Sequence, residues 1–284
     1  MLISTEINSF RRFGTDKEVI KMLKESGFTA YDFSMTSGAG IELLKSDDYI
    51  EKAKDLRAFA DSIGIPCNQT HAPFATARKG NEEYNKKMFP QIVRALEISA
   101  ILGAKICVVH PCNDYTPEEN AVMYKPFEEV AKKVGIKIAT ENMWNWPKGS
   151  EYCTPAACST PESFIKHIDI VNDPYLVACL DIGHAEMKGS TTSAVELIHA
   201  LGKRLECLHV HDNDKRLDSH ELPFTMDIDF VPIMQALKDI GYNGWLTLEA
   251  WQHKNNGTRE ETIEIIKKAA ASANRLNDIY ESLK

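Results

Sequence analysis

The sequence predicts an α/β fold, a (β/α)8 TIM barrel formed by a single domain over residues 1–284. Eight short runs rich in Val, Ile, Leu, Cys and Thr alternate with helical patterns along the chain, which indicates repeated βαβ units and a parallel sheet. Six apolar runs end at or just before a His, Asp or Glu residue. From His71 to Glu249, successive residues of this set are 39, 31, 40, 30 and 38 positions apart, which is the length of a strand, a helix and two loops. Barrels place their active site at the C-terminal ends of the strands, so one pattern predicts both the fold and the site.

Each element follows from its local pattern. Strands are expected in the eight apolar runs, at 2–6, 28–34, 64–70, 104–110, 136–141, 176–181, 205–211 and 245–249. Helices are expected between and after them, at 16–26, 48–63, 83–102, 117–133, 161–170, 191–202, 230–240 and 258–281. Glycines mark the points where a helix should end before the next strand, at Gly64, Gly135, Gly241 and Gly244. Two long connections, 142–160 and 212–229, are expected on the C-terminal face, where barrels carry substrate-binding loops.

Composition narrows the class of protein. A chain of 284 residues with 43% hydrophobic content can bury a full core, and single barrel domains commonly have about 250 residues. The N-terminal segment MLISTEINSFRRFG lacks the basic region and long apolar stretch of a secretory signal. No stretch approaches the roughly 18 apolar residues of a membrane helix. We therefore expect a cytoplasmic protein without a membrane partner.

Cysteine content and charge give two further expectations. The seven cysteines are an odd number without a CxxC pair, and several fall in predicted strands, which favours reduced, buried thiols. The net charge of −8 argues against a nucleic-acid partner, because Lys and Arg supply most of the non-specific affinity for phosphates. The chain also lacks a P-loop, a GxGxxG after a strand and a GxSxG motif. Nucleotide hydrolysis, dinucleotide redox chemistry and serine chemistry therefore have no local support in the sequence.

Two glutamates are the first candidates for catalysis. A glutamate that closes an apolar strand is costly to bury unless it is paired. Glu141 and Glu249 end the fifth and eighth predicted strands, so they should face each other across the mouth of the barrel. Two carboxylates that approach one carbon from opposite faces can remove a proton and return it. The alternative for each is a structural glutamate held in a salt bridge.

Asp181 and His211 extend this pair to a candidate metal site. Together with Glu141 and Glu249 they form an oxygen-rich set with one imidazole, which suits Mn²⁺, Mg²⁺, Co²⁺ or Zn²⁺. A divalent ion there would polarise a carbonyl group and hold an enediolate oxygen during proton transfer. The alternative for each residue is a helix cap or a polar residue of the core.

Five more residues are candidates for additional metal ligands or for substrate binding. They lie at strand ends or in the segment HDNDKRLDSHELPFTMDIDF, and they are His71, His110, His184, Asp218 and His220. A structural histidine is the alternative for the first three. Strand alternation points His209 in the same direction as His211, one layer deeper, where it would contact the ligands.

Aromatic and basic residues near these positions are candidates for substrate contacts. Lys215 and Arg216 could bind an anionic group or simply be solvated. Tryptophans directly follow site positions and could form an apolar wall over a sugar ring or pack in the core; they are Trp144, Trp146 and Trp251.

The segments HAPF, VVHP, TEN, LDIGH, HVHDND and LEAW resemble the xylose isomerase-like TIM barrel superfamily, from about residue 25 to about residue 275. This superfamily includes sugar (phosphate) isomerases and epimerases and the type IV apurinic-site endonucleases (AP endonuclease family 2). Resemblance to the ketose 3-epimerases implies metal ligands at Glu141, Asp181, His211 and Glu249. It also implies that the two glutamates form the acid/base pair and that His184 reaches the substrate.

Resemblance to the endonucleases implies a larger set of ligands around three zinc ions. These would be His71, His110, Glu141, Asp181, His184, His211, Asp218, His220 and Glu249. Against this branch stand the net charge and the segment HPCND, where an endonuclease would carry an HPGSH-like loop. The stretch LPFTMDID also departs from the Gly-rich turn that follows the seventh strand in both branches.

We therefore expect a metal-dependent sugar or sugar-phosphate isomerase or epimerase, in which protons move between two glutamates through a metal-stabilised enediolate. The alternatives are a zinc-dependent apurinic-site endonuclease and a metal-dependent lyase or dehydratase that acts on a polyol or a sugar conjugate. The expected partner is a small-molecule sugar or sugar phosphate. The native metal, phosphorylation of the substrate and the oligomeric state stay open, and a homo-oligomer is compatible with the fold.

Overall fold

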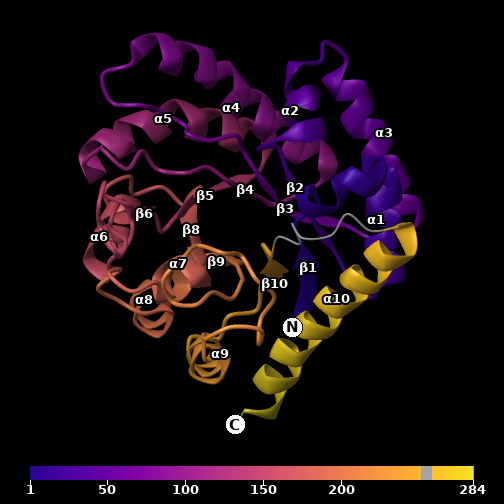
Figure 1. Ribbon diagram of the computed structural model, residues 1–284. Helices are drawn as coiled ribbons and strands as arrows, with labels where there is room; N and C mark the ends of the chain where they lie inside the picture. Colours follow the sequence, from indigo (N-terminus) through magenta and orange to yellow (C-terminus); the bar gives the residue numbers. More distant parts are fainter. Residues whose placement is uncertain (251–257, 284) are drawn as a thin grey trace.

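The computed structural model describes residues 1–250 and 258–283, and its strands form a barrel (Figure 1). In these residues the parallel strands of the barrel are β1 (Leu2–Thr5), β2 (Tyr31–Ser34), β3 (Cys67–His71), β4 (Ile106–Val108), β5 (Lys137–Glu141), β8 (Leu176–Asp181), β9 (Leu205–His209) and β10 (Trp245–Leu248). Strands β2 to β9 pair in chain order, and β1 pairs with β10. Single bridges from Glu6 to Asp32 and from Val210 to Leu248 join these two groups and close the barrel. The predicted eight-stranded parallel barrel is confirmed.

Helices surround the strands, and the eight predicted helices are confirmed to within a few residues. They are α1 (Asp16–Glu25), α3 (Tyr49–Ser62), α4 (Glu82–Leu102), α5 (Pro117–Val134), α6 (Pro161–Asp169), α8 (Ala194–Leu201), α9 (Phe230–Asp239) and α10 (Arg259–Ser282). Shorter elements that the sequence did not predict lie in the connections. They are the 3₁₀ helices η1 (Asn8–Phe13) and η2 (Gly202–Arg204), the helices α2 (Gly38–Lys45) and α7 (Ile182–Glu186), and the hairpin of β6 (Trp144–Asn145) and β7 (Thr154–Pro155).

Local chemistry explains where the helices begin and end. Helix α5 begins with a capping box, in which the Thr116 side chain accepts from the backbone N–H of Glu119 and the Glu119 side chain accepts from that of Thr116. The same helix ends at Gly135, whose φ of +77° is the left-handed conformation that glycine adopts without strain. These signals position the strand β5, which carries Glu141.

The interior of the barrel has an apolar side and a polar side. On one side, small apolar residues of β4, β5, β8 and β9 form a cluster: Ile106, Val108, Ala139, Val177, Cys179 and Cys207. On the other side, buried polar side chains of β1, β2, β3 and β10 form a hydrogen-bonded chain: Ser4, Asn68, Thr247, Gln69 and Asp32. The polar chain ends at Asp32, directly below the mouth.

A large hydrophobic core between the barrel and its helices holds the scaffold together. All seven cysteines are free and buried, which confirms the expectation of reduced thiols. In the described part of the chain, no helix has both the length and the apolar character that crossing a membrane requires.

Candidate active site

The predicted site residues gather at the C-terminal mouth of the barrel. His71, Glu141 and Asp181 are the last residues of β3, β5 and β8. His211 follows the end of β9 by two residues, and Glu249 directly follows β10. Because parallel strands end at the same rim, these side chains meet although they lie far apart in the sequence.

Glu141 is the centre of the first group of side chains. Its Oε2 lies 3.0 Å from Nε2 of His110 and 3.8 Å from Nε2 of His71. Its Oε1 lies 3.0 Å from Nδ1 of His209, and Oε2 of Glu249 approaches the same nitrogen at 3.3 Å. Four residues whose candidate metal-ligand atoms all lie within 4.8 Å of one another therefore meet here: Glu141, Asp181, His209 and Glu249.

Asp218 is the centre of a second group. Its carboxylate lies 3.3 Å from Nε2 of His184, 3.3 Å from Nε2 of His220 and 3.4 Å from Nε2 of His211. The Nε2 atom of His211 is also 3.1 Å from Oδ1 of Asp181. His211 therefore joins the second group to the first, and the mouth of the barrel holds one continuous cluster of imidazoles and carboxylates.

The short helix α7 positions His184. Asp181 caps this helix, because its carboxylate accepts a hydrogen bond of 2.7 Å from the backbone N–H of His184. The helix turns the chain back over the mouth of the barrel directly after β8. The carbonyl oxygen of Asn142 then lies 2.9 Å from Nδ1 of His184 and orients its ring.

The connection 212–229 positions Asp218 and His220. Asp212 is fully buried, and its carboxylate accepts hydrogen bonds from three backbone N–H groups between residues 225 and 228. These bonds fold the connection back on itself beside the strand ends. Although its segment LPFTMDID lacks the Gly-rich turn, the connection thus presents Asp218 and His220, which precede that segment, to the cluster.

The histidines of the cluster are oriented as metal-binding imidazoles usually are. In four of them Nδ1 lies within hydrogen-bonding distance of a backbone carbonyl oxygen: His71 with Ala72, His184 with Asn142, His211 with Asp212 and His220 with Glu249. An N–H at Nδ1 that donates to this oxygen leaves Nε2 directed at the carboxylates. Proteins commonly fix the ring and tautomer of a metal-binding histidine in this way.

The cluster also fits a cation because several of its atoms have no other partner. Within residues 1–250 and 258–283, the buried atoms that form no hydrogen bond include Oε2 of Glu141, Oδ2 of Asp181, Nε2 of His211 and Oδ1 of Asp218. Three of these atoms lie close to another charged group of the cluster, but without the geometry of a hydrogen bond. A buried polar atom without a partner costs free energy. A divalent ion coordinated by these oxygen and nitrogen atoms would remove that cost.

The pKa values of the cluster reflect the mutual attraction of its charges. Burial would raise the pKa of Glu141, but the imidazoles of His209 and His110 hold it well below its ordinary value. Burial disfavours the protonated form of His184, yet the carboxylates of Asp181 and Asp218 raise its pKa well above the ordinary value. The His220 pKa is raised to about 9, against the effect of burial, mainly by Asp218. Positive charge is therefore stabilised strongly at this position.

A pocket of about 270 Å³ opens above the cluster. Cluster residues form its floor, and further lining residues come from the loops around the mouth: Glu6, Asn8, Ser34, Thr36, Phe74, Met143 and Trp144. The ring of Phe74 stacks on His110 with centroids 4.9 Å apart, and Trp144 meets His184 edge-on at 6.2 Å. The predicted contact of Trp144 with the site is thus present as one wall of the pocket.

Two of the predicted substrate contacts do not line the pocket. Lys215 forms an ion pair with Glu186 at 3.6 Å, and neither Lys215 nor Arg216 lines the pocket. Both residues lie in the 212–229 connection, where the backbone N–H of Lys215 donates to Oδ1 of Asn213 and that of Arg216 donates to Oδ1 of Asp214. Trp251 lies outside the described residues.

Glu6 and Asp32 belong to the site although the sequence analysis did not identify them. Glu6 directly follows β1 and lines the pocket. Asp32 is 1% exposed, and its Oδ2 lies 3.7 Å from Nε2 of His209. His209 therefore connects Asp32 to Glu141 and Glu249 below the pocket, in the deeper position that strand alternation predicts. The signal for Glu6 was the one used for Glu141, a carboxylate at or directly after the end of a strand, whereas Asp32 is the second residue of β2 and carries no such signal.

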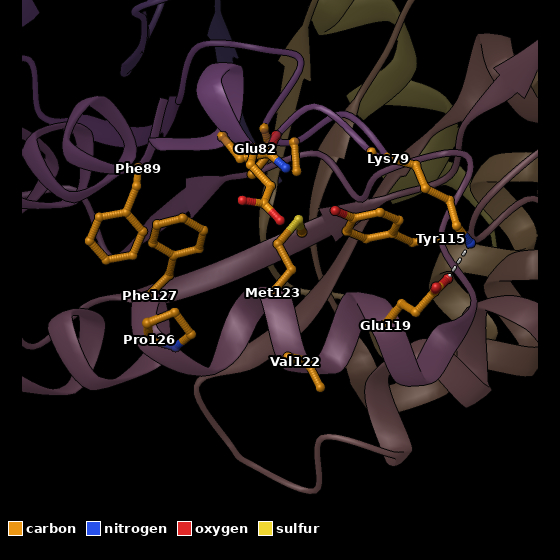
Figure 2. Close-up of a pocket in the computed structure, with 13 residues that line it drawn as sticks. Lys79, Glu82, Phe89, Tyr115, Glu119, Val122, Met123, Pro126 and Phe127 are labelled. Carbon is orange, nitrogen blue, oxygen red and sulfur yellow. Dashed lines mark hydrogen bonds and ion pairs between the residues drawn. The ribbon is translucent and has the colours of Figure 1, made fainter. Parts of the chain in front are cut away.

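A second hollow, of about 580 Å³, lies between α4 and α5 and shares no residue with the strand-end pocket. Figure 2 shows Phe89, Met123, Pro126 and Phe127 along it, with the ion pair of Lys79 and Glu119 at one side. It is larger than the pocket above the cluster but contains no histidine or cysteine. The cluster of imidazoles and carboxylates therefore lies at the smaller pocket, which is the candidate active site.

Comparison with known families and proteins agrees with this fold. The model of the family described as "xylose isomerase-like TIM barrel" matches residues 20–274. An uncharacterized protein of Methanocaldococcus jannaschii is 30% identical over 210 residues, which cover 69% of this chain and 68% of that protein. An inosose dehydratase of Geobacillus kaustophilus is 37% identical over 102 residues, 29% of this chain and 32% of that enzyme.

Solved structures share the same overall fold. A D-tagatose 3-epimerase-like protein superposes with a TM-score of 0.71 at 24% identity, over 97% of this chain and 99% of that one. The IolI protein with a zinc atom superposes with a TM-score of 0.74 at 19% identity, over 99% of this chain and 98% of that one.

Proposed function

The chain belongs to the xylose isomerase-like TIM barrel family, and from this premise we propose that it is a metal-dependent isomerase or epimerase that acts on a carbohydrate. One observation supports this proposal most strongly. Glu141 and Glu249 come from opposite parts of the sequence, yet both contact His209, and their carboxylates lie within the same 4.8 Å group as Asp181. Two carboxylates so placed can serve one substrate carbon.

Glu141, Asp181, His211 and Glu249 would hold the ion. Three carboxylates and one imidazole favour a hard or borderline divalent cation such as Mn²⁺, Mg²⁺, Co²⁺ or Zn²⁺. When bound, such an ion supplies a Lewis acid for the carbonyl and hydroxyl oxygens of the substrate. The IolI structure, which contains zinc, supports the choice of a metal-dependent reaction.

The two glutamates would move the proton. One glutamate, as its carboxylate, would remove the proton from the carbon next to the substrate carbonyl, which leaves an enediolate, and the other glutamate, as its carboxylic acid, would give its own proton to the enediolate. His209 contacts both glutamates and so fixes their relative position. Phe74, Met143 and Trp144 line the pocket with apolar surface that excludes water from the reacting carbon. His184 lines the same pocket and would bind a substrate hydroxyl.

The test combines metal analysis with hydrogen exchange. Protein purified without a metal-affinity tag is analysed by elemental mass spectrometry, loaded with the ion found, and incubated in D₂O with a panel of ketoses and keto-polyols. We expect about one ion per chain and NMR-detected exchange of one substrate C–H. Glu141→Gln and Glu249→Gln should each slow the exchange by about 10²–10⁴-fold, the usual contribution of a general acid or base.

A matched glutamate provides the control. Glu206 pairs with Lys137 at 2.5 Å near the N-terminal end of β5, away from the mouth, so Glu206→Gln should leave exchange unchanged. Undiminished exchange in Glu141→Gln or Glu249→Gln would show that the acid/base assignment is wrong. Analysis of the product distinguishes epimerisation or isomerisation from loss of water, the reaction expected of a dehydratase.

A second candidate function, that of an apurinic-site endonuclease, is favoured because the cluster contains every ligand that this branch implies. All nine residues that the endonuclease branch implies meet at the barrel mouth, in groups that include His71, His110 and Glu141 as well as His184, His211, Asp218 and His220. We therefore test zinc-loaded protein on duplex DNA with an abasic site. Chelator-sensitive cleavage would support an apurinic-site endonuclease, and the absence of cleavage at micromolar protein would exclude it.

A further inference from the structure

The pocket above the cluster has an unequal distribution of charge. Four carboxylate residues line it, namely Glu6, Glu141, Asp218 and Glu249, and no lysine or arginine of the described chain does so. The histidines and the proposed ion lie over β3 to β10. The sector over β1 and β2 is formed instead by Glu6 with neutral amide and hydroxyl groups.

Glu6 brings a carboxylate to this sector. Burial and the charges of Glu249 and Asp32 raise its pKa, and the hydrogen bonds from Ser9 act in the opposite direction. Glu6 is 4% exposed, and its carboxylate accepts hydrogen bonds from the backbone N–H of Asn8 at 2.5 Å and of Ser9 at 3.0 Å, as well as from the Ser9 hydroxyl. These donors hold the side chain at the start of η1, where it lines the pocket. An ionised carboxylate offers about four acceptor positions, so one remains for a substrate hydroxyl.

Neutral polar groups complete the sector. The hydroxyls of Ser34 and Thr36 lie 2.8 Å apart, and either of them can be the donor in that bond. The hydroxyl that accepts keeps its own O–H for a further partner, and both keep acceptor capacity. Such groups match the alternating donors and acceptors of a polyol. They provide no countercharge for a phosphate.

The guanidinium of Arg11 contacts this sector at two residues. Its Nη1 donates to the carbonyl oxygen of Ser34 at 2.6 Å and to Oδ1 of Asn8 at 3.4 Å, and its Nε forms an ion pair of 2.8 Å with Asp16. The side chain is 8% exposed and is not among the residues that line the pocket. Its charge is thus already balanced by Asp16.

The volume of the pocket limits the size of the substrate. Small-molecule sites usually measure about 300–1,000 Å³, so a pocket of about 270 Å³ lies just below this range. Phe74, Met143 and Trp144 supply apolar contact for the C–H face of one small ring or chain.

We propose that the substrate is an uncharged ketose or cyclic keto-polyol of monosaccharide size, and that the sector formed by Glu6, Asn8, Ser34 and Thr36 discriminates against its phosphorylated counterpart. This proposal rests on the proposed isomerase or epimerase function. The physical reason is that a phosphate at this wall would lose its hydration without gaining a lysine or arginine partner from the described residues that line the pocket, and would meet the carboxylate of Glu6.

The test uses matched pairs of substrates with the metal-loaded protein. D-fructose and D-fructose 6-phosphate, D-ribulose and D-ribulose 5-phosphate, and further ketoses with their phosphates are compared by C–H exchange in D₂O. We expect kcat/KM for the free sugar of the active pair to exceed that for its phosphate by at least about 100-fold. A preference for the phosphate would overturn this inference and leave the proposed function intact. Absence of exchange in every pair would overturn both.

A gain-of-function variant tests the role of the sector itself. Thr36 is only partly buried, so Thr36→Lys can place an ammonium group at this wall. We expect the ratio of kcat/KM for the phosphorylated to the free sugar to rise by about tenfold or more. Ser62→Lys, on the exposed surface of α3, adds the same charge elsewhere and should leave the ratio unchanged. An equal rise in both variants, or none in Thr36→Lys, would contradict discrimination by this wall.

Discussion

A β-carbon on Gly183 would lie 1.9 Å from Cε1 of His211 and 2.3 Å from its Nε2. The absence of a side chain at Gly183 therefore allows α7 to lie directly against the His211 imidazole. His211 is fully buried and contacts both Asp181 and Asp218. The glycine in the segment LDIGH is required for packing against a proposed metal ligand.

Gly183→Ala should accordingly displace His211. Real β-carbons do not approach other atoms so closely, so either α7 or the imidazole must move. We expect the affinity for the divalent ion to fall by about 10–100-fold, as when the support of a ligand is removed. Isothermal titration with Mn²⁺ or Zn²⁺ measures this change.

Gly64→Ala is the control, because its φ of +68° predicts a stability loss of roughly 1 kcal/mol without any contact to the site. Equal metal affinity of the Gly183→Ala variant and the unmodified protein would contradict the requirement.

His209 should stabilise the metal-free protein more than the metal-loaded one. Burial opposes its protonation, but the carboxylates of Glu249, Glu141 and Asp32 raise its pKa well above the ordinary value. In chelator, His209→Gln leaves these buried carboxylates without their imidazolium, which should cost about 3–5 kcal/mol of unfolding free energy. With saturating metal the loss should be smaller, because the ion supplies positive charge to the same carboxylates. Urea unfolding in both conditions measures the difference.

An exposed histidine provides the comparison. His199 is 48% exposed in its side chain and lies 3.8 Å from Asp239, so His199→Gln should change the unfolding free energy by about 0–1 kcal/mol. Equal losses in the two variants would mean that His209 does not balance the carboxylates.

Much of this site could be predicted because its signals are local. An apolar run that ends in His or Glu predicts both a buried strand and a polar residue at its end, and this was enough for His71, Glu141, Asp181 and Glu249. The same signal was present at Glu6 in LISTE, where a carboxylate follows a strand. It could have been recognised there too.

Other features depend on contacts that the local sequence does not reveal. The close approach of Gly183 to His211 and the stacking of Phe74 on His110 join residues that follow different strands. Helix α2 contains Gly38 and Gly40, which lower its intrinsic helix propensity, so tertiary packing rather than local preference forms it. The orientation of Lys215 likewise follows from the fold of the 212–229 connection.

Asp218→Asn tests whether the second group of ligands binds its own ion. Our proposal places one ion per chain between Glu141, Asp181, His211 and Glu249, so Asp218→Asn should leave the metal content near one ion per chain. Asp181→Asn, the matched change in the first group, should reduce it well below one, because it removes a proposed ligand. Elemental mass spectrometry after dialysis counts the ions. A wild-type content of two or three zinc ions that falls by one in Asp218→Asn would favour the endonuclease alternative.

Glu128 on α5 provides a test of pH dependence away from the site. It is 5% exposed, and its Oε1 is buried without a hydrogen-bond partner. Burial, together with the nearby charge of Asp173, raises its pKa to about 7, while Lys132 acts in the opposite direction. Lys132 itself is held by Asp173 in a short ion pair. The carboxyl group of Glu128 therefore keeps its proton in the folded protein at pH values where the unfolded chain has lost it.

Glu128→Gln should therefore stabilise the protein at high pH but not at low pH. Between the ordinary pKa of 4.5 and the folded value of about 7, the folded state binds more protons than the unfolded state, so the contribution of Glu128 to stability falls as pH rises. Glutamine has no charge to bury, and at pH 8 we expect a gain of about 1 kcal/mol after allowance for solvent screening. At pH 5 the gain should be close to zero.

Urea unfolding at the two pH values measures this gain in stability. Glu129→Gln on the exposed face of α5 is the control, since the Glu129 side chain is 71% exposed. If Glu129→Gln gave the same gain at pH 8, or if Glu128→Gln gained equally at both pH values, burial of the Glu128 carboxylate would not be the cause.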